Sequence, residues 1–251
     1  MKPIRTIAAS VAGLALLAGC EQATSEGLAP STAATTVRVV HASRDAGAAR
    51  LQVDNGALTG VLNFRDTAVV TIPGGARRLR LYAAADTARA VLDATVTLVP
   101  ESRNTIVVAG YVDSLAFAPR SPRPAAGNRL RLITVQDGGV VFPGTAAARG
   151  GVRVIHAAAN INVVDGTPQV ATNAQVLAWL FPASSGTRGS PAFGGAALAL
   201  GAVSEYAPID TAGIGPFRLE VTSNSTTAPV SRVLFNLPTP GNRQMWTAVV
   251  L

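Results

Sequence analysis

The chain has 251 residues, 48% of them apolar, so it is long enough for two modest domains that each bury a core. It carries 21 basic and 14 acidic residues, and two of the basic ones, Lys2 and Arg5, lie in the leader described next. The remaining positive excess is modest and consists of arginine without interleaved aromatic residues, so the composition does not favour a nucleic-acid partner.

Residues 1–19 have the form of a lipoprotein signal peptide. A cationic start is followed by an uncharged apolar stretch at 7–17, which is too short to span a bilayer as a stable helix. The stretch ends in Leu-Ala-Gly-Cys at 17–20, which resembles the bacterial lipobox. This resemblance implies cleavage before Cys20 and acylation of its sulfur and its new amino group, and several acyl chains anchor a protein stably. An ordinary cleaved leader with a chance cysteine is the alternative.

The residues after the leader predict the cellular location of the protein and a flexible tether. In the lipoprotein pattern, an Asp after the cysteine favours the inner membrane, whereas this chain has Glu21. We therefore expect an exported protein, lipid-anchored in the cell envelope at the outer membrane of a two-membrane bacterium. Residues 20–36 lack apolar periodicity and indicate a flexible tether. Cys20 is the only cysteine, so its acylation leaves no thiol for a disulfide or a nucleophile.

A motif that occurs twice divides the rest of the chain. Val-Arg-Val-Val-His-Ala-Ser at 37–43 returns as Val-Arg-Val-Ile-His-Ala-Ala at 152–158. Such self-similarity is the signature of a repeated structural unit. We therefore expect a first repeat at 37–137 and a second at 152–251, joined by a glycine-rich linker at 138–151.

The first repeat consists of short segments in which apolar and polar residues alternate, separated by turn residues, and this pattern is typical of strands. Segment 78–82 shows the alternation best, with leucines on one face and arginines on the other. Segment 105–109 is apolar on both faces, which indicates a central strand. Seven short strands without a helical period predict an all-β fold of two tandem immunoglobulin-like β-sandwich domains. The expected strands lie near 37–41, 51–53, 68–72, 78–82, 92–98, 105–109 and 129–136.

The motifs of this repeat resemble those of a known family. They are VRVVHAS, VDNG, TIPGG, RLRL and TIVVAG. Together they resemble the bacterial "domain of unknown function 4397" family, and the resemblance extends over both repeats. It implies a secreted or surface-attached protein of tandem β-sandwich repeats whose molecular role is unassigned. The chain departs from the family's Ser-Pro-Asp-Ala-Pro after the histidine, because Arg44 replaces the first proline and Gly47 the second.

The second repeat differs from the first in two ways. It contains extra material at 173–203, which includes an apolar segment at 176–181 and a stretch rich in Ser, Gly and Pro. It also has no counterpart of the strand at 129–136. Because proteins normally cover an exposed sheet edge, we expect either that 176–181 fills the place of the missing strand or that 129–136 serves both repeats.

Both histidines, His41 and His156, occupy the same place in the motif. A Ser-His-Asp triad can be drawn from His41, Ser43 and Asp45, but such triads are assembled in space rather than along five residues. The second repeat has Ala and Asn at the matching serine and aspartate positions. Two histidines in separate repeats also do not supply the three or four ligands of a zinc site. We interpret each histidine as structural, closing its strand and bonding to a neighbouring loop backbone.

Two groups of residues are candidates for binding. Arg77, Arg78 and Arg80 offer guanidinium groups that pair well with phosphate or with an anionic glycan, although outward strand positions near a turn are normally charged. Trp179 and Phe181, with Phe193 beyond them, form an aromatic group on the inserted segment, where function tends to lie. Core packing is the preferred interpretation for Trp179.

The sequence therefore predicts a lipid-anchored envelope protein that is not an enzyme, has no cofactor or metal, and acts as a binding or scaffolding module. Its expected partners are the membrane, through Cys20, and an envelope protein or an anionic glycan. One alternative is an envelope hydrolase that uses carboxylates from different loops, since such pairs need not be close in sequence. A purely structural spacer is the other.

Overall fold

A computed structural model shows an all-β, sandwich-like protein, which confirms the predicted fold class. It describes residues 33–112, 129–138, 149–158, 163–164, 167–168, 175–185, 192–210, 216–223, 231–238 and 244–251. The leader, Cys20, most of the tether and most of the linker lie outside these ranges. The segment Ser31–Leu251 is one compact unit. Within the described ranges, no helix has the length and apolar character needed to cross a membrane.

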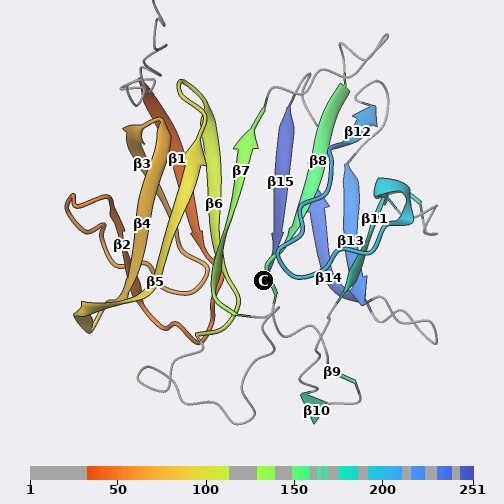
Figure 1. Ribbon diagram of the computed structural model, residues 1–251. Coiled ribbons are helices and arrows are strands. Elements are labelled where there is room, and N and C mark those ends of the chain that lie inside the picture. The colour runs from red at the N-terminus through yellow and green to blue at the C-terminus, as the bar shows by residue number, and fades with distance from the viewer. Residues whose placement is uncertain are drawn as a thin grey trace, which may run out of the picture. The chain divides into compact units, whose positions relative to one another are not determined.

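The first repeat contains two sheets that face one another (Figure 1). One sheet has the order β3-β1-β6-β7 and the other the order β2-β4-β5. Most neighbours are antiparallel, but β1 and β6 run parallel. The strands are β1 (Ala34–His41), β2 (Ala49–Val53), β3 (Thr67–Pro73), β4 (Gly75–Ala83), β5 (Asp86–Leu98), β6 (Arg103–Ala109) and β7 (Arg131–Asp137).

The second repeat follows the same plan. Its sheets have the orders β12-β8-β15 and β11-β13-β14, and β8 and β15 are again a parallel pair. A small two-stranded sheet joins β9 to β10. The elements are β8 (Arg149–His156), β9 (Val163–Val164), β10 (Thr167–Pro168), β11 (Val176–Pro182), the 3₁₀ turn η3 (Phe193–Gly195), β12 (Ala207–Asp210), β13 (Phe217–Ser223), β14 (Ser231–Leu237) and β15 (Met245–Val250).

Strand β11 corrects one expectation about the supposed insertion. It pairs with β13 just as β2 pairs with β4, so segment 176–181 is the counterpart of β2 and does not fill the place of a missing strand beside β15. The other expectation, that 129–136 serves both repeats, is met by side-chain packing but not, within the described ranges, by strand pairing. β7 hydrogen-bonds to β6 alone among the described strands, yet its Ile133 and Val135 side chains pack against the second repeat.

Three apolar clusters follow from the alternation of the strands. Val37, Leu79 and Ile106 belong to the core between the sheets of the first repeat, and Val154 and Leu219 belong to that of the second. Alternate residues point to opposite faces of a strand. The outward residues of β1, β6, β7, β8 and β15 therefore form a third cluster between the repeats, which includes Val40, Val107, Ile133, Ile155 and Val249. We call this contact the seam.

The seam explains why segment 105–109 is apolar on both faces. Ile106 and Val108 point into the core of the first repeat, and Val107 and Ala109 point into the seam.

The strands also begin earlier than the expected repeat boundaries. β1 starts at Ala34, because Thr35 and Thr36 already pair with β3, and Thr35 Oγ1 donates a hydrogen bond to Ser102 O at 2.7 Å.

Candidate functional site

His41 is fully buried at the end of β1 and is held by the loop that follows. Its Nδ1 accepts a hydrogen bond from Ser43 N at 3.3 Å, so Nε2 carries the proton and donates to Gly47 O at 2.7 Å. Burial lowers the pKa of His41, and the bond to Gly47 and the carboxylates of Asp66 and Asp45 oppose that shift. The geometry matches a structural role, in which the neutral ring joins strand to loop.

The Ser43 hydroxyl does not point to the imidazole as a triad requires. Its Oγ lies 2.7 Å from Gly110 O and 3.1 Å from Asp45 Oδ1, and the other carboxylate oxygen of Asp45 accepts from Val112 N at 3.1 Å. These bonds join the loop after β1 to the end of β6. In the described ranges, no three His, Cys, Asp or Glu residues lie close enough to hold a metal ion.

His156 is also fully buried and repeats the backbone contacts of His41. Its N–H donates to Ala202 O at 3.0 Å and its carbonyl accepts from Gly201 N at 2.8 Å. The corresponding partners of His41 are Asp66 O and Arg65 N. Arg65 and Gly201 both have positive φ, 76° and 88°, so each repeat closes its motif strand with the same left-handed turn.

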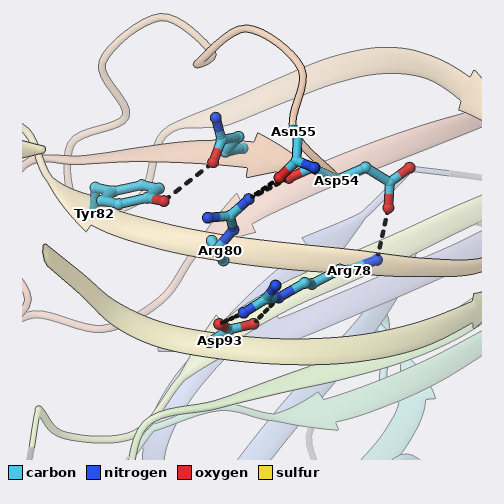
Figure 2. Close-up of polar contacts among 7 residues, drawn as sticks. Asp54, Asn55, Arg78, Arg80, Tyr82 and Asp93 are labelled. Atoms are coloured by element: carbon cyan, nitrogen blue, oxygen red, sulfur yellow. Dashed lines mark hydrogen bonds and ion pairs between the residues drawn. The ribbon is translucent and has the colours of Figure 1, made fainter. Parts of the chain in front are cut away.

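Arg78 and Arg80 lie on the outer face of β4, each engaged by a neighbour (Figure 2). Arg78 forms a two-pronged ion pair with Asp93 on β5, at 2.8 and 2.5 Å. Hydrogen bonding to Arg78 lowers the pKa of Asp93 and raises that of Arg78. Arg80 donates to Asp54 O at 2.7 Å and to Asn55 Oδ1 at 2.5 Å.

Arg77 alternates with Arg78 and Arg80 along β4, so its side chain starts from the other face of the strand. It donates to the carbonyls of Pro73 and Gly74 at 2.9 and 2.6 Å, and its Nη1 lies 3.5 Å from Asp54 Oδ2. The three arginines proposed from the sequence thus already bind carbonyls and carboxylates of their own repeat. These contacts stabilise the turns and strands of the first repeat, and they occupy the guanidinium groups that an anion would need.

Trp179 and Phe181 lie on the face of β11 opposite the core. Val176 and Ala178 point into the core of the second repeat, so the alternating residues Trp179 and Phe181 point outward. Trp179 is half-buried and its Nε1 donates to Thr222 Oγ1 at 3.1 Å, and Phe181 is buried. Core packing, the preferred interpretation, therefore does not describe Trp179.

Phe193 differs from these two aromatic residues. It begins η3 and packs against the core of the second repeat.

The seam holds a buried arginine that the sequence did not single out. Arg153, 5% exposed, donates from Nη2 to Asp137 Oδ1 at 2.5 Å and from Nη1 to Gln136 O at 2.8 Å. Its Nε donates to Thr247 Oγ1 at 3.0 Å, and its guanidinium lies 4.8 Å from the centre of the Tyr206 ring. These contacts join β8 to the end of β7, and hence one repeat to the other.

A groove of 370 Å³ opens at the same place and is lined by both repeats. The first repeat contributes Arg38, Arg103 and Asp137, and the second contributes Tyr206, Gln244 and Thr247. The volume falls within the range of small-molecule sites.

The sequence held one signal for this groove. Arg38 and Arg153 occupy the same position in the repeated motif, one residue after its first valine. Their face of the strand is the one that packs in the seam, and that packing is not visible in the sequence.

No protein-family model and no curated protein matches the chain. Among solved structures, it is similar to the TIE protein of Bacillus anthracis, with 9% identity over 87% of this chain and 34% of that one, at a TM-score of 0.24. A leucine-rich repeat protein of Bacteroides thetaiotaomicron has 11% identity over 86% of this chain and 26% of that one, at a TM-score of 0.21.

A variant of the major pilin of Streptococcus pyogenes has 8% identity over 87% of this chain and 99% of that one, at a TM-score of 0.13. The chain thus spans about a third of the first of these proteins and about a quarter of the second. At such low TM-scores the three likenesses support no conclusion about role. The resemblance to the domain of unknown function 4397 family stays a prediction.

Proposed function

We propose that the chain is a lipid-anchored protein of the cell envelope that acts as a non-catalytic binding or scaffolding module. The anchor is supported by the Leu-Ala-Gly-Cys sequence at the end of a short apolar stretch, with acylation at Cys20. Glu21 after the cysteine supports the outer membrane. The resemblance to secreted tandem-repeat proteins of unassigned role agrees with this proposal.

The observation that carries the binding role is the groove at the seam. Arg153 and Asp137 join the repeats beside it, and the apolar cluster of Ile133, Ile155 and Val249 lies in the same contact. A site whose walls are already held in place loses less conformational entropy when a ligand binds. A purely structural spacer would not need a groove lined by polar and charged residues of both repeats, so the groove favours a preformed binding surface.

The hydrolase alternative receives less support from five acids of the first repeat whose partners the structure describes. A hydrolytic pair needs two carboxylates that face one another across a substrate. In the first repeat, Asp93 pairs with Arg78, Asp137 with Arg153 and Asp54 with Arg77. Asp66 accepts two hydrogen bonds from Asn63 and Asp45 accepts one from Val112 N. These five carboxylates hold turns and strands together.

The anchor is tested by replacing its acylation site. Cells that express the intact chain or the Cys20→Ser variant are labelled with a radioactive fatty acid and separated into membrane and soluble fractions. We expect label and membrane recovery for the intact chain and neither for Cys20→Ser. Equal labelling of both, or a mature N-terminus elsewhere than residue 20, would contradict the anchor.

The binding role is tested by cross-linking in living cells. A photo-reactive residue replaces Met245, which lines the groove, or Val61, which is 42% exposed in a loop of the first repeat. We expect mass spectrometry of the intact chain to show an adduct from position 245 and none from 61. No adduct at either position would favour the spacer. Deleting 173–203 is not a suitable test, because the deletion removes β11.

A further inference from the structure

We propose that Arg38 and Arg103 bind an oxyanion, the carboxylate or phosphate group of a ligand about the size of a monosaccharide, in the groove at the seam. This inference rests on the proposed binding function and assigns its ligand a chemistry. The arginines singled out from the sequence, Arg77, Arg78 and Arg80, lie elsewhere on the first repeat.

The charge of the groove favours an anion. Arg38 and Arg103 are both exposed, and within the part of the chain that the structure describes neither forms an ion pair or a side-chain hydrogen bond. Asp137 is the one carboxylate among the lining residues. Its oxygens are already occupied, since Oδ1 accepts from Arg153 Nη2 and Oδ2 accepts from Thr105 Oγ1 at 2.6 Å. Two guanidinium groups therefore face the groove without a described acid to neutralise them.

The second repeat shows what an arginine at this motif position can hold. Arg153 is the counterpart of Arg38, and it binds a carboxylate, that of Asp137. The first repeat presents the same residue on the same face of the equivalent strand, with its side chain in the groove. An incoming carboxylate or phosphate would give Arg38 the kind of partner that Arg153 already has. Guanidinium groups suit both, because their planar donors match two oxygens at once.

The spacing of the two arginines suits one anionic group. Arg103 pairs in register with Thr36, and Arg38 lies two residues further along β1 on the same face. One strand spacing combined with a two-residue step separates their Cα atoms by roughly 8 Å. Two long side chains from such positions can converge on a single carboxylate or phosphate. The hydroxyl and amide groups of Tyr206, Thr247 and Gln244 on the opposite repeat suit the neutral hydroxyl groups of a sugar.

The test uses the intact chain, purified from membranes in detergent, and three probes of similar size. Glucuronic acid carries a carboxylate, glucose 6-phosphate carries a phosphate, and glucose carries neither. Binding is measured by isothermal titration calorimetry and by chemical-shift changes. The Arg38→Gln/Arg103→Gln variant removes the proposed site, and the Arg44→Gln/Arg89→Gln variant removes the same charge from exposed positions outside the groove.

We expect one or both acidic sugars to bind and glucose not to bind. The affinity should fall about tenfold or more in the Arg38/Arg103 variant and stay unchanged in the Arg44/Arg89 variant. It should also weaken as salt is raised, because the arginines are exposed. The preferred probe identifies the source of the oxyanion.

Three results would overturn the inference: no binding of either acidic sugar, equal binding of glucose, or equal losses in the two variants. A groove adduct in cells together with any of these would leave the binding function standing and remove only the oxyanion. Binding of an acidic sugar to the purified chain without a cross-linked adduct in cells would support the oxyanion site. It would count against the proposal that the groove binds a ligand in the cell envelope. Thermal unfolding of both variants checks that the fold is intact.

Discussion

At the scale of single residues, the two copies of the motif place the same arginine in different surroundings. Arg153 is buried and its guanidinium nitrogens all donate, to Asp137, Gln136 and Thr247. Arg38 is exposed and has no such acid among the described residues. Burying an ion is costly unless a partner compensates for its lost hydration. Asp137 compensates the buried charge of Arg153, so Arg153 has a structural role. Arg38 has no such partner among the described residues and is available for a ligand.

The motif histidine His41 makes the stability of the protein depend on pH. Burial lowers its pKa in the folded state below the ordinary 6.5, so the unfolded chain takes up a proton first as the pH falls. The stability contributed by the neutral, buried His41 is fully present above the pKa of histidine in the unfolded chain. It decreases as the pH falls from about 6.5 toward the pKa of His41 in the folded chain. His41→Gln retains a donor for Gly47 O but does not titrate, so the free energy of unfolding of this variant should depend less on pH in that range.

Urea unfolding of the unmodified chain and of His41→Gln at about pH 7.5, 6.5 and 5.5 measures how strongly the free energy of unfolding of each depends on pH. His156 is present in both proteins, so the difference in slope belongs to His41. A variant with an equal or steeper loss of stability in acid would show that the buried ring of His41 does not titrate as described.

At the scale of elements, the turns at one end of the first sandwich are packed closely. Gly74, between β3 and β4, lies against Pro100, between β5 and β6, and a Cβ added to Gly74 would lie 2.7 Å from the Pro100 Cα. Because that contact is with backbone, Gly74→Ala should force the turns apart and lower the free energy of unfolding by about 1–3 kcal/mol.

Gly60 provides the matched control. A Cβ added there meets nothing within 4 Å, and its φ is not positive. Gly60→Ala should therefore leave the stability unchanged or raise it by up to about 1 kcal/mol. Urea unfolding of both variants decides the matter, and equal effects would mean that the close contact at Pro100 relaxes without cost.

Most strands of the first repeat could be predicted from the sequence because they alternate against their own core, and β6 because it is apolar on both faces. In β4, buried Leu79 and Leu81 alternate with outward Arg78 and Arg80, as the sequence predicts. The second repeat was harder, since β11 was interpreted as part of an insertion. Its apolar outward residues Leu177, Trp179 and Phe181 mask the period of two that identifies a half-buried strand.

The candidate site was less predictable than the fold. Arg38 and Arg103 lie far apart in sequence and come together only because β1 and β6 run parallel in register. The groove further requires that the outer faces of two repeats meet, and periodicity does not say which apolar outer face finds a partner. Arg77, Arg78 and Arg80 stood out in the sequence because they are adjacent, although their partners are local turns and strands.

At the scale of the whole molecule, the seam makes the two repeats depend on one another. Ile155 is fully buried there with Val107 and Ile133 of the first repeat, so separating the repeats would expose apolar surface from both. It would also part Arg153 from Asp137. We therefore expect the repeats to unfold together, in one cooperative transition.

The positions of the tryptophans allow this expectation to be checked directly. The chain has two tryptophans, Trp179 and Trp246, and both belong to the second repeat. Tryptophan fluorescence therefore reports unfolding of the second repeat, whereas circular dichroism reports strands of both repeats. In the intact chain, the two signals should change at the same urea concentration. Ile155→Asp places a charge in the apolar seam, which costs several kcal/mol while the chain remains packed there. The seam should then open, and the two signals should separate.

Leu234→Asp is the control for the added charge, because Leu234 is in the same repeat but 51% exposed. A substitution at such a site usually changes stability by less than about 0.5 kcal/mol, so the two transitions should stay coincident. Separate transitions in the unmodified chain would show that each sandwich is stable alone and that the seam only holds them in contact. The groove would then have walls that move independently, and a ligand bridging Arg38 and Thr247 would have to bring the repeats together at a cost in affinity.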